Sequence, residues 1–228
     1  MEKMHIEQFE VTCANHEEAL ELKQEIFSHH NYYFESETLS PRIIDVGAHI
    51  GMATLYFKKQ YPDARITALE PHPLSFQLLQ KNIEENRVYG VELLNVALSS
   101  TKATRLLHSD TVDNWYSTSS FTAGAWNNLQ KTEPIRVPTV TLSELITEPI
   151  DLLKIDIEGA EYDVLYHTPD EILRKIKHAS IELHQTKVGQ NDDLIEWLEK
   201  RGFTSSLRKN PHNYSGLNAA LAILEISR

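Results

Sequence analysis

The chain has 228 residues, and 33 acidic residues against 22 Lys and Arg give it a formal net charge of −11. Hydrophobic residues make up 41% and charged residues 24% of the sequence, which excludes disordered and fibrous classes. This length suits one domain with a full hydrophobic core. Binding through nucleic-acid phosphates requires a basic surface, so the acidic balance argues against a nucleic-acid partner.

The sequence gives no indication of a membrane or secretory protein. No apolar run approaches the roughly 18 residues that a membrane-spanning helix needs, so we expect no membrane partner. Residues 1–5 lack the basic stretch and apolar run of a secretory signal. Cys13 is the single cysteine, which excludes internal disulfides and cysteine-based metal clusters. These features predict a cytoplasmic protein.

Short apolar runs alternate with helical patterns from Pro41 onward. This alternation predicts an α/β fold with a Rossmann-like, doubly wound, mostly parallel sheet and helices on both faces. Two runs near the C-terminus, 203–207 and 221–226, predict an antiparallel hairpin at the edge of a seven-stranded sheet. The other expected strands are 42–46, 66–69, 91–98, 152–157 and 179–183. The expected helices are 53–57, 74–86, 161–165, 169–176 and 192–201.

The first sheet strand leads into a glycine turn, Asp45-Val46-Gly47-Ala48-His49-Ile50-Gly51. In an open parallel sheet, ligands bind beyond the carboxyl ends of the strands, where the strand order reverses. Glu70 ends the second strand, where a carboxylate can accept the hydroxyl protons of a ribose. A dinucleotide is disfavoured because His49 occupies the position of the second glycine that a pyrophosphate requires. Asp45 and Glu70 would suit a phosphate-free nucleoside with a cationic amino-acid arm.

This turn resembles the glycine motif of class I S-adenosylmethionine-dependent methyltransferases, and Glu70-Pro71 resembles their ribose-binding acidic position. The segment Lys154-Ile155-Asp156-Ile157-Glu158-Gly159-Ala160-Glu161 is similar to the signature of the FkbM family. Asn95-Val96-Ala97-Leu98-Ser99 resembles that family's segment after the third strand. The likeness spans about residues 41–184. His49 stands where the family more often has Asn, and both side chains can donate and accept hydrogen bonds.

The resemblance implies an S-adenosylmethionine-dependent O-methyltransferase that acts on a hydroxyl of a small molecule, sugar or natural-product intermediate. Gly47 would lie close to the methionine part of the cofactor, and Glu70 would bind the ribose. His72 would lie near the adenosine, residues 95–97 would line the adenine, and Asp156 would face the reacting methyl group. The expected cofactor-binding residues are Asp45, Gly47, Ala48, His49, Gly51, Glu70, His72, Asn95, Val96, Ala97 and Asp156.

We expect the methyltransferase domain to extend over residues 41–228. Residues 1–40 contain a predicted helix over 16–28 and are expected to form a helical cap. The segment 110–132 is an aromatic insertion, and a loop of this length is usually functional or disordered. We interpret this segment as part of the wall that binds the methyl acceptor. The alternative is that its aromatic residues only anchor the loop to the rest of the domain. Its large aromatic residues are Trp115, Tyr116, Phe121 and Trp126.

An alcohol acceptor must lose its proton as the new bond forms, and the candidate bases at strand ends are Asp156, Glu182 and His184. We expect His184 to be the general base because an unperturbed imidazole titrates near neutral pH. Asp156 would then position the imidazole or the acceptor. The same three side chains could bind a divalent ion. We favour a metal site less. Glu182 and His184 are two positions apart on one strand, and such residues share a face simply because side chains alternate along a strand.

Several alternatives stay open. The acceptor atom could be nitrogen, the protein could be a cofactor-binding module without catalysis, and His184 could simply cap a loop. Glu161 is expected in the first turn of a helix, where a carboxylate favours the positive end of the helix dipole. Glu158 should lie nearer the cleft. The sequence fixes neither the acceptor nor the oligomeric state, and a homodimer is one option.

Overall fold

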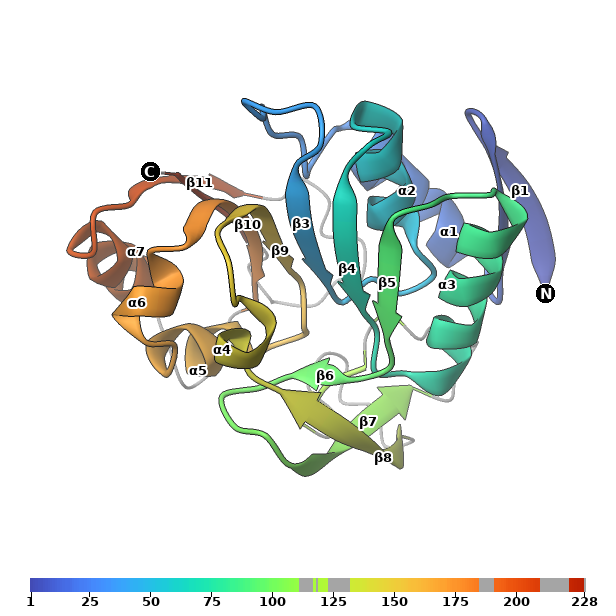
Figure 1. The fold of residues 1–228 in the computed structure, drawn as a ribbon. Coiled ribbons are helices and arrows are strands. Elements are labelled where there is room, and N and C mark those ends of the chain that lie inside the picture. Colours follow the sequence, from blue (N-terminus) through green and yellow to red (C-terminus); the bar gives the residue numbers. More distant parts are fainter. Residues whose placement is uncertain (111–116, 118, 123–131, 185–190, 210–221, 228) are drawn as a thin grey trace.

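The computed structural model describes residues 1–110, 117, 119–122, 132–184, 191–209 and 222–227. A seven-stranded sheet of order β11-β12-β10-β9-β3-β4-β5 forms the centre of this part of the chain (Figure 1). Its strands are β3 (Arg42–Val46), β4 (Arg65–Leu69), β5 (Val91–Leu94), β9 (Ile150–Ile155), β10 (Ile176–Leu183), β11 (Thr204–Lys209) and β12 (Ala222–Ser227).

The strand directions confirm the predicted doubly wound sheet. Strands β3, β4, β5, β9 and β10 are parallel, while β12 is antiparallel to both β10 and β11. The predicted C-terminal hairpin therefore lies at the sheet edge. The chain runs from β3 outward to β5 and then returns to the other side of β3 as β9. The strand order thus reverses between β3 and β9, and ligands bind at such a point in open α/β sheets.

Helices cover both faces because neighbouring residues of a buried strand point to opposite sides. Ile43 faces a core that includes α1 (His16–Lys23), α2 (Met52–Gln60) and α3 (Pro73–Glu85). Ile44 faces the other core, formed by α4 (Leu142–Leu145), α5 (Glu161–Tyr166), α6 (Asp170–Leu173) and α7 (Asn191–Glu199). The sheet is therefore buried between two layers of helices. Among the described residues, no helix has the length and apolar character to span a bilayer.

The N-terminal segment is more than the expected helical cap. It begins with an antiparallel hairpin, β1 (Glu2–Ile6) and β2 (Phe9–Cys13), before α1 and the π-helical turn η1 (Gln24–Ser28). The hairpin contacts α3 through Asn82, whose side chain accepts from Thr12 N–H (2.8 Å) and donates to Thr12 O (3.0 Å). The same amide group donates to Ile50 O in the glycine turn at 2.8 Å. Asn82 therefore connects the hairpin to the turn.

The predicted strand over 91–98 is two strands. It leaves the main sheet after Leu94, and β6 (Ala97–Leu98) pairs with β8 (Thr132–Val140), which pairs in turn with β7 (Thr104–Asp110). This small sheet lies below the carboxyl ends of β3, β4 and β5 in Figure 1. We did not predict β8, because Pro134 and Pro138 interrupt its strand pattern. The aromatic insertion joins β7 to β8; Trp115, Tyr116 and Trp126 lie outside the described residues.

Candidate active site

A cavity lies at the carboxyl ends of β3, β4 and β9, where the strand order reverses. Its walls come from the glycine turn, from the segment before β6, from the turn after β9 and from the N-terminal segment. Phe121, in the aromatic insertion, also lines it. Of the expected cofactor-binding residues, seven line the cavity: Gly47, Ala48, His49, Glu70, Val96, Ala97 and Asp156.

The other four expected cofactor-binding residues are not among those that line the cavity in the described part of the chain. Asp45 is fully buried and accepts a hydrogen bond from Thr54 Oγ1 at 2.7 Å. His72 is the N-cap of α3, and Asn95 donates to Glu70 O at 2.7 Å. Gly51 precedes α2 with a left-handed backbone. Through these hydrogen bonds, Asp45, His72 and Asn95 support the segments around the cavity.

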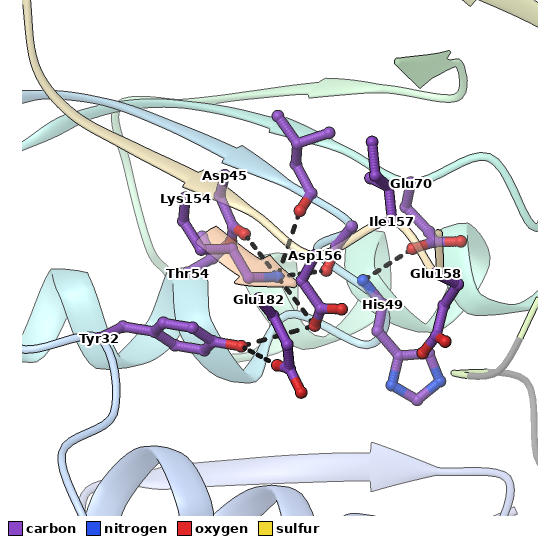
Figure 2. A network of polar contacts seen from close by, with 12 residues as sticks. Tyr32, Asp45, His49, Thr54, Glu70, Lys154, Asp156, Ile157, Glu158 and Glu182 are labelled. Carbon is purple, nitrogen blue, oxygen red and sulfur yellow. Dashed lines mark hydrogen bonds and ion pairs between the residues drawn. The ribbon is translucent and has the colours of Figure 1, made fainter. Parts of the chain in front are cut away.

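The glycine turn packs directly against the end of β9. Gly47 has a φ of 75°, and a Cβ atom at this position would lie 1.8 Å from the backbone oxygen of Asp156. Lys154 connects the same two segments, because its Nζ donates to Gly47 O at 2.7 Å and lies 3.4 Å from Asp45 Oδ1 (Figure 2). We did not predict this role, although a lysine within the apolar run of β9 was a visible signal.

Lys154 stays charged in spite of its burial. Burial by itself would lower the pKa of this amine, but the carboxylates of Asp45 and Asp156 outweigh it and raise the pKa. Nζ lies 3.6 Å from Asp156 Oδ2, so one buried cation serves two carboxylates. The ion pair between Lys154 and Asp45 thereby connects strands β9 and β3 immediately below the cavity.

Glu70 presents its carboxylate to the cavity from the end of β4. Its Oε2 accepts from His49 N–H and its Oε1 from His72 N–H, each at 2.8 Å. Burial raises the pKa of Glu70 to about 7, and the two backbone hydrogen bonds oppose that rise. Each oxygen keeps a further lone pair for a ligand. The geometry therefore suits the ribose-binding role that the sequence predicted.

His49 carries an imidazole with unmet hydrogen-bonding capacity. The residue has a left-handed backbone (φ 49°) and is only 9% exposed, and it lines the cavity. Among the described residues, neither ring nitrogen has a hydrogen-bond partner; Nε2 lies 3.7 Å from Glu18 Oε2. Burial lowers the pKa of His49, so the neutral ring can donate from one nitrogen and accept at the other.

Asp156 and Glu182 approach each other at the ends of β9 and β10, as expected for adjacent parallel strands. The hydroxyl of Tyr32 lies between them, 3.5 Å from Asp156 Oδ2 and 3.2 Å from Glu182 Oε2 (Figure 2). Burial and the charge of Asp156 raise the pKa of Glu182 to about 8. Tyr32 lines the cavity and was missed, because only a long-range contact brings it to the strand ends.

His184 is held between two carboxylates and is not among the residues that line the cavity. Its Nδ1 lies 2.8 Å from Glu161 Oε1 and its Nε2 lies 3.3 Å from Glu158 Oε2. Burial would lower the pKa of this imidazole, but the two carboxylates raise it well above its usual value. A protonated ring cannot accept a proton, so this geometry does not support our expectation that His184 is the general base.

Glu161 begins α5, as predicted, and has a second structural role. Its side chain is fully buried, and Oε1 accepts hydrogen bonds from Ile157 N–H (3.3 Å) and Gly159 N–H (3.1 Å). The same oxygen contacts His184 Nδ1. Glu161 therefore fixes both the turn after β9 and the orientation of the imidazole.

Comparison with known proteins identifies the family of this chain. Residues 45–205 match the model of the Methyltransferase FkbM domain. Methyltransferase sdnD of Sordaria araneosa is 30% identical over 217 residues, covering 82% of each chain. Methyltransferase 1 of Beauveria bassiana is also 30% identical, over 73% of this chain and 74% of its own length. The 31-O-demethyl-FK506 methyltransferase FkbM of Streptomyces tacrolimicus is 28% identical over 88% of each chain.

Solved structures share the fold at low sequence identity. The methyltransferase FkbM of Methylobacillus flagellatus superimposes with a TM-score of 0.56 and 13% identity; the match covers 86% of this chain and 45% of that chain. The METTL16 methyltransferase domain gives a TM-score of 0.52, also at 13% identity, over 92% of this chain and 68% of the other. The fold is that of a class I methyltransferase. The chain belongs to the FkbM methyltransferase family.

Proposed function

We propose that this protein transfers a methyl group from S-adenosylmethionine to a hydroxyl oxygen of a small molecule, such as a sugar or a natural-product intermediate. The observation that carries the proposal is one cavity lined by both Glu70, which suits a ribose, and Asp156, which suits an acceptor hydroxyl. The relative from Streptomyces tacrolimicus is named for an oxygen acceptor on FK506, which supports oxygen over nitrogen. The net charge of −11 agrees with a free small-molecule acceptor rather than a nucleic acid.

The cavity residues fit the cofactor that family membership implies. Glu70 would accept hydrogen bonds from the ribose hydroxyls, and Val96 and Ala97 offer an apolar surface for the adenine. Gly47 leaves the backbone open beside the methionine part, and the unpaired nitrogens of His49 can bind polar groups there. When bound, S-adenosylmethionine supplies an electrophilic methyl group on a sulfonium, and the protein supplies alignment. Alignment can contribute about 7–11 kcal/mol to lowering a barrier in favourable cases.

Asp156 replaces His184 as our candidate for the group that receives the acceptor's hydroxyl proton. It is the carboxylate at the end of β9 that lines the cavity, with a side chain 25% exposed. Tyr32 O–H and Lys154 Nζ contact its Oδ2, so its position is fixed while its other oxygen can face an acceptor. General base catalysis typically contributes about 10²–10⁴-fold in rate.

An amine acceptor is the second candidate. Four carboxylates line the cavity, from Glu25, Glu70, Asp156 and Glu158, and such a lining would attract a cationic amine. Hydrolysis of the methylated product distinguishes the two, because methyl ethers, methyl esters and methylamines differ in their stability to acid and base.

Calorimetric titration with S-adenosylmethionine tests the cofactor site. We expect the wild-type protein and Glu92→Ala, an exposed acid on β5, to bind with equal affinity, and Glu70→Ala to bind at least about 10-fold more weakly, as for a lost charge-assisted hydrogen bond. Mass spectrometry of S-adenosylhomocysteine formed with a panel of hydroxylated and amino compounds then identifies the acceptor class. Absence of cofactor binding by folded protein would refute the proposal.

A further inference from the structure

Asp156, Glu158 and His184 form a cluster just after the carboxyl ends of β9 and β10. One potential ligand atom from each residue lies within 4.8 Å of the other two. Two atoms bound to one Mg²⁺ are at most about 4.2 Å apart, because each bond is about 2.1 Å long. Small side-chain rotations would therefore bring all three atoms onto one cation. Asp156 and Glu158 line the cavity, so the open positions of such a cation would face it.

The imidazole of His184 has one nitrogen held by Glu161 and the other directed at Glu158. Glu161 Oε1 already accepts hydrogen bonds from two backbone N–H groups and lies 2.8 Å from His184 Nδ1, so Nδ1 must donate to it. This leaves Nε2 directed at Glu158, 3.3 Å away. Metal-binding histidines almost always donate their other N–H to a carboxylate or a carbonyl oxygen in this way. A cation at Nε2 would take the place of the proton there.

His49 provides a separate observation at the same cavity. Its imidazole is nine-tenths buried, and neither nitrogen has a hydrogen-bond partner among the described residues. His49 and Glu158 both line the cavity, and Figure 2 shows both side chains. Buried polar groups are nearly always hydrogen-bonded in folded proteins. His49 has two unpaired nitrogens, so an oxygen ligand or a water held by a cation at the cluster would provide a partner for one of them and leave the other for the cofactor.

We propose that Asp156, Glu158 and His184 bind one divalent cation of the Mg²⁺ or Mn²⁺ type. Two carboxylates and one imidazole suit these metals, which accept oxygen ligands and keep open positions for water or substrate oxygens. The cation would hold an oxygen of the methyl acceptor beside Asp156; this role, unlike the site itself, rests on the proposed function.

Titration of the EDTA-treated full chain with Mn²⁺, followed by the electron paramagnetic resonance signal of free Mn²⁺, tests the site. We expect one tight site per chain in the wild-type protein. Glu158→Gln and His184→Gln should weaken it by more than about 100-fold, and Glu161→Gln by about 10–100-fold, as for substitutions that disturb the orientation of a ligand. The control is His167→Gln, an exposed histidine paired with Asp163 next to α5, which should bind as the wild type does. Thermal unfolding identifies variants that fail to fold.

Spin-echo spectroscopy of the Mn²⁺-loaded protein provides a second readout. A coupled imidazole nitrogen should be present in the wild type and in His167→Gln, and absent in His184→Gln. If the wild type binds no stoichiometric Mn²⁺, if neither Glu158→Gln nor His184→Gln weakens binding, or if no nitrogen coupling is seen, the cation site is refuted. S-adenosylmethionine binding measured in EDTA separates the two proposals, because failure of the cation site alone leaves that binding intact.

Discussion

The hydroxyl of Tyr32 lies 3.2 Å from Glu182 Oε2, although the two residues are 150 positions apart in the sequence. The same hydroxyl reaches Asp156, at 3.5 Å. Through Tyr32, the N-terminal segment becomes part of the wall that surrounds the strand ends. The wall of the cavity therefore includes residues outside the parallel sheet.

Removing this hydroxyl should destabilise the protein. Tyr32→Phe removes the donor that the buried Glu182 shares with the partly exposed Asp156, and loss of a hydrogen bond to a buried group typically costs about 1–3 kcal/mol in the free energy of unfolding. We also expect a lower kcat, because Asp156 loses a contact that fixes its position. Urea denaturation and steady-state kinetics measure the two effects.

Tyr33→Phe is the matched control. The Tyr33 hydroxyl contacts Glu35 at the surface, at 3.3 Å, so its loss should leave the unfolding midpoint and kcat unchanged. Equal behaviour of the two variants would contradict the role we assign to Tyr32.

Lys154→Met should be the most damaging single change of charge. It leaves Asp45, fully buried, with no cation, and breaking a buried pair by removing one partner typically costs about 3–5 kcal/mol. Cofactor affinity should fall as well, because Lys154 Nζ holds Gly47 O in the glycine turn. Chemical denaturation measures the first effect and calorimetry the second.

The comparison variant is Lys102→Met. Lys102 pairs with Glu144 but is 74% exposed, and exposed pairs contribute little to stability. Its unfolding midpoint should match that of the wild type. A similar midpoint for Lys154→Met would show that the buried charges below the cavity do not stabilise the fold.

Glu70 should make stability depend on pH. Its pKa of about 7 in the folded protein exceeds the usual 4.5, so the folded state binds this proton more tightly than the unfolded chain does. Stability should therefore fall as pH rises from about 4.5 to about 7, by on the order of 3 kcal/mol. Glu70→Gln should remove this part of the pH dependence. Thermal unfolding at several pH values, with Glu92→Gln as the control, measures it.

Cofactor binding should show the opposite trend. Ribose hydroxyls donate to the ionised form of Glu70, so S-adenosylmethionine should bind more tightly as pH rises through about 7. Calorimetry in buffers of different ionisation enthalpy should detect proton release on binding. An affinity that stays flat from pH 6 to 8 would argue against a ribose at Glu70.

Gly47→Ala tests the close packing of the glycine turn on β9. The added Cβ would lie 1.8 Å from Asp156 O, so the turn must move, and we expect large losses of stability and cofactor binding. Gly202→Ala is the control: Gly202 has a similar φ of 86° with no atom within 4 Å of the added carbon. It should show only the left-handed backbone penalty of about 1–2 kcal/mol. Comparable unfolding midpoints would mean that contact with Asp156 is unimportant.

The parts of the candidate site that local sequence patterns encode could be predicted. The glycine turn and Glu70 follow buried strands, and the alternation of strands and helices fixes where strand ends meet. Tyr32 and Lys154 were missed as site residues because their roles depend on contacts between distant segments. The sequence identified His184 as a candidate, but its protonation depends on Glu158 and Glu161, which only the folded chain brings to its two nitrogens.

The link through Asn82 has a practical consequence for shortened versions of the protein. This one amide group satisfies backbone groups of both Thr12 and Ile50. Deleting the first thirteen residues would strip it of two of its three bonds and expose the apolar side of α3 to water. Such a truncation would retain every residue of the family signature and still weaken the support beneath the nucleoside pocket.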